Sequence, residues 1–183
     1  MDYLVTACAT CSATIIRLWP VLARELLPDN PELIAQIDAL AEKTVDISWL
    51  LAKRFDLESP FDGKLATQTR VTVHDPCHLK KSLGISHEPR SLIRACGHTL
   101  VEMKTPDLCC GMGGSFNLSH YDLSARIGEQ KAADIVQTRC HIAAASCPAC
   151  MMQISDMLAR KQSPIRVMHP VEIYAERLKA GNG

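Results

Sequence analysis

The chain has 183 residues, of which 47% are hydrophobic and 22% charged, so it can bury the core of one domain and part of a second. Its 20 Lys and Arg residues balance 20 Asp and Glu residues, which leaves no basic field for nucleic acid and no basic run for a membrane surface. No apolar run approaches the roughly 18 residues of a spanning helix, and the first residues lack the features of a secretion signal. We therefore expect a cytoplasmic protein with no nucleic-acid partner and no membrane span.

The first third of the chain predicts one strand and two helical stretches. Residues 3–7 (YLVTA) have the composition of a buried strand, and a helix should follow over about 12–27, bent at Pro20. After the turn PDNP, apolar residues recur at near-helical spacing, which predicts one long helix over 32–55. Residues 59–68 (SPFDGKLATQ) have the composition of a linker.

Beyond this linker, short strands alternate with helices. The expected strands cover residues 70–74, 99–103, 141–145 and 165–168. The expected helices cover residues 89–96, 121–139, 148–160 and 171–178. Such alternation is typical of α/β proteins in which a parallel sheet carries helices on both faces, and this is the fold class that we predict.

An internal repeat links the two ends of the chain. The segments LVTACATC (4–11) and AAASCPAC (143–150) both predict a small-residue strand, a C-x-x-C motif and a helix. We interpret residues 1–58 as the C-terminal remnant of a first unit with a helical connection, and residues 59–183 as a complete second unit. An unpaired strand is prone to association. We therefore expect residues 3–7 to be an isolated edge, to be disordered, or to join a partner chain, most simply in a homodimer.

Nine cysteines in a chain with no secretion signal and an ordinary core indicate metal or redox chemistry rather than a disulfide framework. Five of them follow three successive strands of the expected sheet. Because the carboxyl ends of parallel strands meet at one edge, their thiols should converge. We predict one metal site formed by Cys77, Cys109, Cys110, Cys147 and Cys150. A redox disulfide or unligated thiols are the alternatives.

The residues around these cysteines favour a large metal centre. Cys147 and Cys150 lie at the start of a predicted helix, where a thiolate is stabilised. Gly111, Gly113 and Gly114 follow the adjacent cysteine pair, and bare backbone there should approach a bulky cluster and donate N–H bonds to its sulfurs. Zinc takes four ligands in a compact tetrahedron. Five cysteines and a glycine-rich segment therefore favour an iron–sulfur cluster, with zinc as the alternative.

The other four cysteines are interpreted differently. Cys8 and Cys11 form an incomplete second site, for which ligation, a disulfide and free thiols all stay open. Cys96 and Cys140 lie on or after predicted helices and should pack as small hydrophobic residues.

Two histidines lie near the predicted site. His78 follows Cys77, and His74 ends the preceding strand. Either of them is a candidate for a hydrogen bond to a cluster sulfur.

The cysteine spacing and the segments around it resemble a known family. The segments are HDPCH, PRSLI, CCGMGG, CPAC and HPVEI, and the resemblance that includes them spans about residues 70–178. Together they resemble the cysteine-rich CCG domain of the heterodisulfide reductase B subunit and of iron–sulfur subunits of glycolate, lactate and anaerobic glycerol-3-phosphate dehydrogenases. Such proteins usually carry two copies, and this segment resembles the C-terminal one. The resemblance implies a Rossmann-like domain.

The resemblance also implies a cofactor and a function. In heterodisulfide reductase the five cysteines hold a non-cubane 4Fe–4S cluster, and other relatives bind an ordinary cluster or zinc. We expect an electron-transfer subunit, or a fragment of one, within an oxidoreductase complex rather than an enzyme alone. Its partners would be a flavoprotein that oxidises a 2-hydroxy acid such as lactate or glycolate, and the missing first CCG unit. Such a complex would lie in the cytoplasm or at the inner face of the membrane.

Two alternatives to this function remain. The first is a heterodisulfide reductase-like subunit that acts on a disulfide. The second is a zinc-stabilised assembly module without a redox role.

Overall fold

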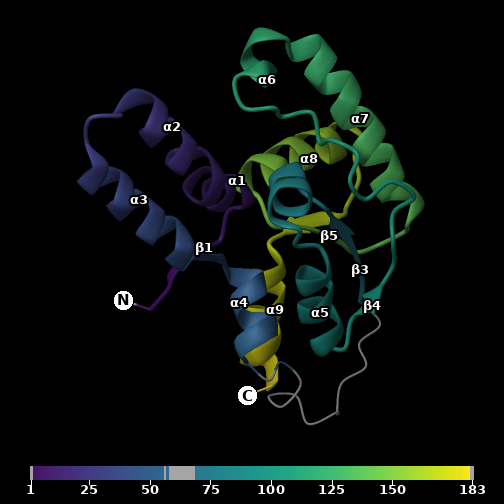
Figure 1. Ribbon diagram of the computed structural model, residues 1–183. Helices are drawn as coiled ribbons and strands as arrows, with labels where there is room; N and C mark the ends of the chain where they lie inside the picture. Colours follow the sequence, from purple (N-terminus) through teal and green to yellow (C-terminus); the bar gives the residue numbers. More distant parts are fainter. Residues whose placement is uncertain (1, 56, 58–68, 182–183) are drawn as a thin grey trace.

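The computed structural model describes residues 2–55, 57 and 69–181, and its main sheet has four parallel strands (Figure 1). In spatial order the strands are β4 (Thr99–Leu100), β3 (Arg70–His74), β5 (Ile142–Ala145) and β6 (Arg166–Met168). One face of the sheet packs against α5 (His87–Ala95) and α9 (Pro170–Gly181), and the other against α7 (Tyr121–Gln137) and α8 (Pro148–Arg160). The predicted α/β fold with helices on both faces is therefore confirmed.

The central strand β5 is buried on both faces, as a central parallel strand should be. Ile142 and Ala144 pack on the α5 and α9 side, whereas Ala143 and Ala145 pack on the α7 and α8 side. The small alanine side chains let helices approach the sheet closely. On α8, burial of each of the large side chains contributes about 1.5–3 kcal/mol. These side chains are Ile154, Met157 and Leu158. The start of α8, where a C-x-x-C motif lies, is thereby held firmly against the sheet.

The first 55 residues differ most from the sequence prediction. The described elements are β1 (Leu4–Thr6), α1 (Ala9–Ala13), the wider helical turn η1 (Thr14–Leu18), α2 (Trp19–Leu26), α3 (Pro31–Lys43), β2 (Thr44–Asp46) and α4 (Ile47–Arg54). The prediction of one helix over 32–55 is wrong, because strand β2 interrupts it. Thr44 and Val45 are β-branched residues that favour a strand. Asp46 then caps α4 by accepting hydrogen bonds from the amides of Ser48 and Trp49 at 2.8 and 3.4 Å.

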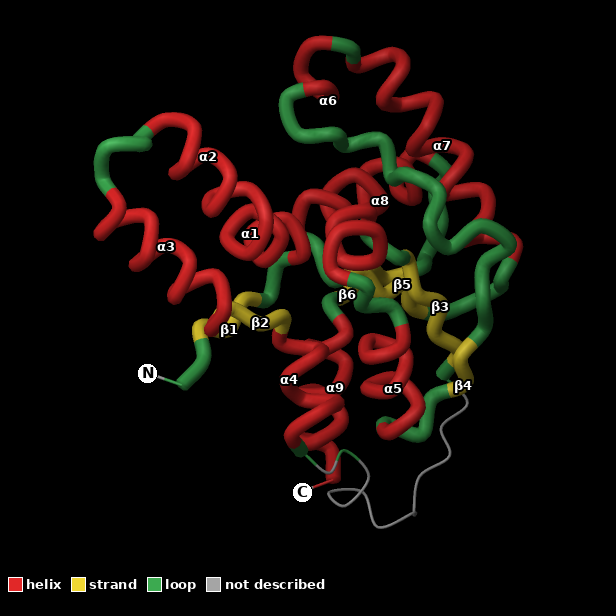
Figure 2. The backbone as a smooth tube through the Cα atoms, in the orientation of Figure 1, coloured by secondary structure: helices red, strands yellow, loops and turns green. Residues whose placement is uncertain are grey.

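Strand β1 is paired within its own chain. It lies parallel to β2, with Leu4 opposite Thr44 and Thr6 opposite Asp46. Figure 2 shows this two-stranded sheet beside the main one, with the α2–α3 hairpin projecting away from both. The expectation of an isolated, disordered or partner-paired strand at residues 3–7 is wrong. The partner strand, β2, lies within residues 32–55, whose apolar residues recur at helical spacing, so the sequence pattern did not reveal it.

The remaining connections differ in length. The chain passes from β3 through the helical turn η3 (His78–Ser82) to α5, and from β4 through a long loop to α6 (Phe116–Ser119) and α7. Strand β4 ends at Leu100, earlier than predicted, although the amide of Val101 still donates to the Val71 carbonyl at 2.9 Å. The predicted linker at 59–68 lies outside the described residues, and the division at residue 58 stays a prediction. None of the helices in the described part of the chain has the length and apolar character needed to cross a membrane.

Candidate metal centre

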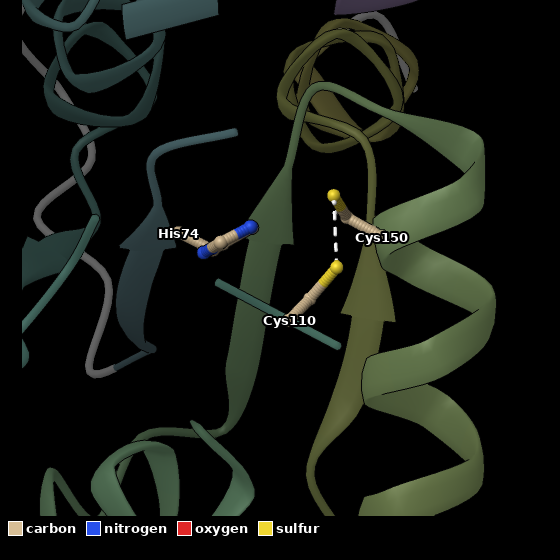
Figure 3. A group of neighbouring side chains, drawn as sticks. All are labelled: His74, Cys110 and Cys150. Atoms are coloured by element: carbon tan, nitrogen blue, oxygen red, sulfur yellow. Dashed lines mark hydrogen bonds between the residues drawn. The ribbon is translucent and has the colours of Figure 1, made fainter. Parts of the chain in front are cut away.

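Three segments bring thiols to the carboxyl edge of the main sheet. Cys77 lies three residues after β3, Cys109 and Cys110 lie in the loop after β4, and Cys147 directly precedes α8. The Sγ atoms of Cys110 and Cys150 are 3.2 Å apart (Figure 3). Three strand ends and the first turn of one helix thus supply sulfur atoms to one place.

The five predicted cysteines interact as one electrostatic group. Hydrogen bonding with the side chains of Cys109 and Cys150 holds the pKa of Cys110 well below its ordinary value, despite burial. The same hydrogen bonds raise the pKa values of Cys109 and Cys150, together with burial and with repulsion from neighbouring thiolates that include Cys77 for Cys109. A hydrogen bond from Cys150, with others from the Thr10 hydroxyl and the first amides of α8, lowers the pKa of Cys147 to about 5. The structure brings the ligand atoms of Cys110 and Cys150 within 4.8 Å of each other and of His74. Cys77, Cys109 and Cys147 lie around this group at the same edge of the sheet, and the role of all five cysteines as ligands stays a prediction.

Exposure divides the five cysteines into two groups. Cys110, Cys147 and Cys150 are buried, whereas Cys77 and Cys109 are exposed. The site therefore has a buried inner wall and an open side. This arrangement shields part of a bound centre from water and leaves another part accessible.

His74 completes the buried wall. Its Nδ1 is 3.1 Å from the Pro106 carbonyl oxygen, and its ligand atom lies within 4.8 Å of the thiols of Cys110 and Cys150. Its Nε2 is buried and has no hydrogen-bond partner among the described residues. Figure 3 shows the imidazole directed toward the two sulfur atoms. Sequence reasoning had identified His74 only through its position at the end of a strand.

Lys131 supports the loop that leads to the cysteine pair, and sequence reasoning missed it. Its ammonium group is buried and donates to the carbonyl oxygens of Thr105 and Pro106 at 2.6 and 3.2 Å. Burial lowers its pKa. The available signal was a lysine on the apolar face of a predicted helix, between Gly128 and Ile135.

Arg90 supports the same edge of the sheet from α5. Its guanidinium binds both carboxylate oxygens of Asp75 at 2.6 and 3.2 Å and both of Glu102 at 2.7 and 3.0 Å. These bonds hold the loop before Cys77 against the loop before Cys109. In the sequence this arginine belongs to the motif PRSLI, and sequence reasoning assigned it no role.

The glycines after the cysteine pair also serve local packing. Gly111 has a φ of +97°, and a Cβ there would come within 2.4 Å of the Ser124 carbonyl oxygen of α7. A Cβ at Gly113 would contact Phe116 at 3.0 Å, and one at Gly114 would meet open space. Gly111 and Gly113 thus serve a local turn and helix packing, and the expectation that these glycines let a cluster approach stays a prediction. Backbone donation to sulfur is present, from the Gly111 amide to Cys109 at 3.3 Å.

The N-terminal C-x-x-C motif lies beside the site. The amide of Ala9 donates to the Ser146 carbonyl at 2.9 Å, which joins the start of α1 to the end of β5. The Thr10 hydroxyl lies 3.5 Å from the Cys147 sulfur and 3.1 Å from Nδ1 of His78. Burial raises the pKa of Cys8 to about 11, and Cys11 is exposed.

Cys96 and Cys140 belong to the core, as predicted. Both are buried. Burial raises both pKa values, that of Cys96 to about 12. At neutral pH these two thiols are protonated and unsuited to metal binding.

The residues present fit a metal–sulfur centre. Two buried sulfur atoms stand 3.2 Å apart, two of the five thiols have lowered pKa values, and the orphaned Nε2 of His74 faces them. Metal binding requires deprotonated sulfur. A metal ion would also give the buried lone pair of His74 Nε2 an atom to bind.

Several known proteins are similar to this chain in sequence. The cysteine-rich CCG domain matches residues 71–155, which include all five cysteines. Lactate utilization protein A of Geobacillus kaustophilus is 30% identical over 178 residues, covering 96% of this chain and 71% of that protein. Its counterpart in Bacillus velezensis is 29% identical over 177 residues, with the same two coverages of 96% and 71%.

A third relative has a different name. The B subunit of the fumarate reductase (CoM/CoB) from Methanothermobacter marburgensis is 31% identical over 175 residues, covering 94% of this chain and 32% of that protein. With the thiols gathered at the strand ends and similarity along nearly all of the chain, this protein belongs to the family of the cysteine-rich CCG domain.

Proposed function

We propose that the chain binds an iron–sulfur cluster and serves as an electron-transfer subunit of an oxidoreductase complex. The ligands would be Cys77, Cys109, Cys110, Cys147 and Cys150. The observation that carries this proposal is the contact between the buried sulfurs of Cys110 and Cys150, 3.2 Å apart, at the edge of the sheet to which the segments with the other three cysteines also lead. When bound, a 4Fe–4S cluster would supply one-electron oxidation and reduction.

The protein's own contribution is binding, shielding and electrostatics. The first turn of α8 favours the thiolate of Cys147. The buried wall of Cys110, Cys150 and His74 keeps water from one side of the site. Arg90 and Lys131 hold the loops that carry Cys77 and Cys109, so the ligands keep their places when the charge of the site changes.

The complex that we propose oxidises a 2-hydroxy acid, with lactate as the first candidate. Support comes from the relatives named lactate utilization protein A, which this chain matches along 96% of its length. A flavoprotein subunit would take two electrons from the hydroxy acid and pass them on singly to the cluster. The cytoplasm, or the inner face of the membrane, is the compartment that we propose for this complex.

A subunit that acts on a disulfide is the second candidate. It is supported by the 31% identity to the B subunit of a fumarate reductase (CoM/CoB). The two candidates require the same cluster site and differ in the partner protein and the substrate.

The test is anaerobic purification followed by iron, sulfide and zinc analysis and visible absorption. We expect about four iron atoms and about four sulfides per chain. Zinc without sulfide would overturn the proposal in favour of a structural module. The purified complex should then lose its visible absorption when lactate is added and regain it with an electron acceptor. Bleaching by a thiol–disulfide couple, and not by lactate, would favour the second candidate.

A further inference from the structure

His74 is buried at the point where the thiols meet. It ends β3, is paired with Ala145 at the end of β5, and has only 2% of its surface exposed. Residue 145 is two positions before Cys147, so the register of β3 on β5 places the imidazole directly beneath the first turn of α8. The backbone at this position therefore directs the side chain toward the thiols.

The hydrogen bond of Nδ1 decides which ring nitrogen carries the proton. Nδ1 lies 3.1 Å from the carbonyl oxygen of Pro106, and a carbonyl oxygen can only accept. Nδ1 must therefore be the protonated nitrogen, and in the neutral imidazole Nε2 has a free lone pair. The same carbonyl also accepts from the Asp75 amide and from Lys131, at 2.9 and 3.2 Å. It is thus held in place from three sides.

The lone pair of Nε2 faces Cys110 and Cys150 and has no partner among the described residues. Without a metal, a thiol hydrogen can occupy the space between nitrogen and sulfur. Metal binding removes thiol protons, and the lone pair would then face the lone pairs of thiolates. A buried acceptor without a donor is destabilising, because it has lost its hydrogen bonds to water. A bond to the metal removes this destabilisation.

We infer that His74 is a further ligand of the metal centre, which it binds through Nε2 between Cys110 and Cys150. This inference rests on the proposed iron–sulfur function. It adds a nitrogen donor to a set of thiolates. The identity of the ligands tunes the reduction potential of an iron–sulfur centre, so His74 as a ligand would shift the potential of the cluster.

The test is pulsed EPR on the cluster-loaded protein in its paramagnetic state, prepared with ¹⁵N-histidine and with natural histidine. We expect a strong nitrogen coupling that changes with the label. His74→Asn keeps an amide that can donate to the Pro106 carbonyl but lacks Nε2. This variant should bind iron and sulfide, lose the coupling and have a shifted reduction potential. The exposed His87, at the start of α5, provides the matched control, and His87→Asn should retain both properties of the wild type.

The outcomes separate the two proposals. A loaded wild-type cluster with no histidine coupling, or with one weak enough for a hydrogen bond alone, overturns the role of His74 and leaves the proposed function intact. A purified chain without iron and sulfide overturns both. If His74→Asn does not fold, His74→Gln, which places an amide near the Nε2 position, serves as the second variant and should also lose the coupling. His78→Asn should retain the coupling, which assigns it to His74 rather than to the other histidine beside the site.

Discussion

The two C-x-x-C motifs have nearly the same local structure and very different surroundings. Cys8 precedes α1 with φ and ψ of −144° and 112°, and Cys147 precedes α8 with −147° and 114°. Each follows a strand by two residues. The matching strand residues, Thr6 and Ala145, are paired with residues of a neighbouring parallel strand.

The surroundings determine what each motif can do. Cys147 and Cys150 are buried and join thiols from two other strand ends, whereas Cys8 is half-buried and Cys11 is exposed. The residue opposite Ala145 is His74, which faces the thiols. The residue opposite Thr6 is Asp46, which caps α4 instead. A strand, two cysteines and a helix therefore make a potential pair of ligands, and only neighbouring segments turn that pair into a metal centre.

The largest expected effect is the loss of the cluster when a cysteine of one motif is replaced by serine, compared with the same replacement at the matching position of the other motif. Cys150→Ser should abolish cluster binding, because it removes the thiol in contact with both Cys110 and Cys147. Cys11→Ser, at the matching position, should retain the iron and sulfide of the wild type, as should Cys96→Ser in the core. Iron and sulfide analysis after anaerobic reconstitution gives the comparison. Equal losses in the Cys150 and Cys11 variants would show that the two motifs share one centre.

Breaking the buried ion pair at the site should lower the free energy of unfolding more than breaking an exposed ion pair on the α2–α3 hairpin. Arg90→Met leaves Asp75 buried without its partner, and breaking such a pair costs about 3 kcal/mol of unfolding free energy. Arg24→Met, which breaks the exposed pair with Asp38 on the α2–α3 hairpin, should cost less than about 1 kcal/mol. Urea unfolding under anaerobic conditions measures both. Similar losses for the two variants would contradict the special role of Arg90 at the site.

The smallest expected effect is at Asp46. Asp46 is paired with Thr6 of β1 in the same way that His74 is paired with Ala145 of β5. Burial raises its pKa above the ordinary value of 3.8. Its contribution to stability is therefore fully present below pH 3.8 and is lost as the pH rises through the folded-state pKa. Asp46→Asn keeps an oxygen that can cap α4 and removes this titration. The variant should gain stability relative to the wild type as the pH rises from about 4 to 7.

Urea unfolding at several pH values measures the difference between variant and wild type. Asp38→Asn, on α3, removes the same charge from a carboxylate in an exposed ion pair and provides the control for the change in net charge. A constant difference between Asp46→Asn and the wild type at all pH values would disprove the burial of a charged carboxylate there.

Much of the main sheet was predictable from local patterns. The β-branched residues of β3 and the proline at the start of α8 are strong local signals, and both elements were predicted with nearly their observed bounds. The convergence of the five cysteines followed from one rule, that parallel strands bring their carboxyl ends to one edge. Strand β2 was not predictable in this way, because three residues with helical neighbours become a strand only when β1 lies beside them.

Local sequence patterns were enough to predict the α/β alternation, the grouping of five cysteines by their spacing and the assignment of Cys96 and Cys140 to the core. These features depend on periodicity, residue size and order along the chain, which are local properties. The folded chain was needed to show that β1 pairs with β2, that Lys131 and Arg90 support the cysteine loops, and that Nε2 of His74 faces two thiols. These are contacts between residues far apart in sequence, and their energies depend on burial and direction, which no local pattern contains.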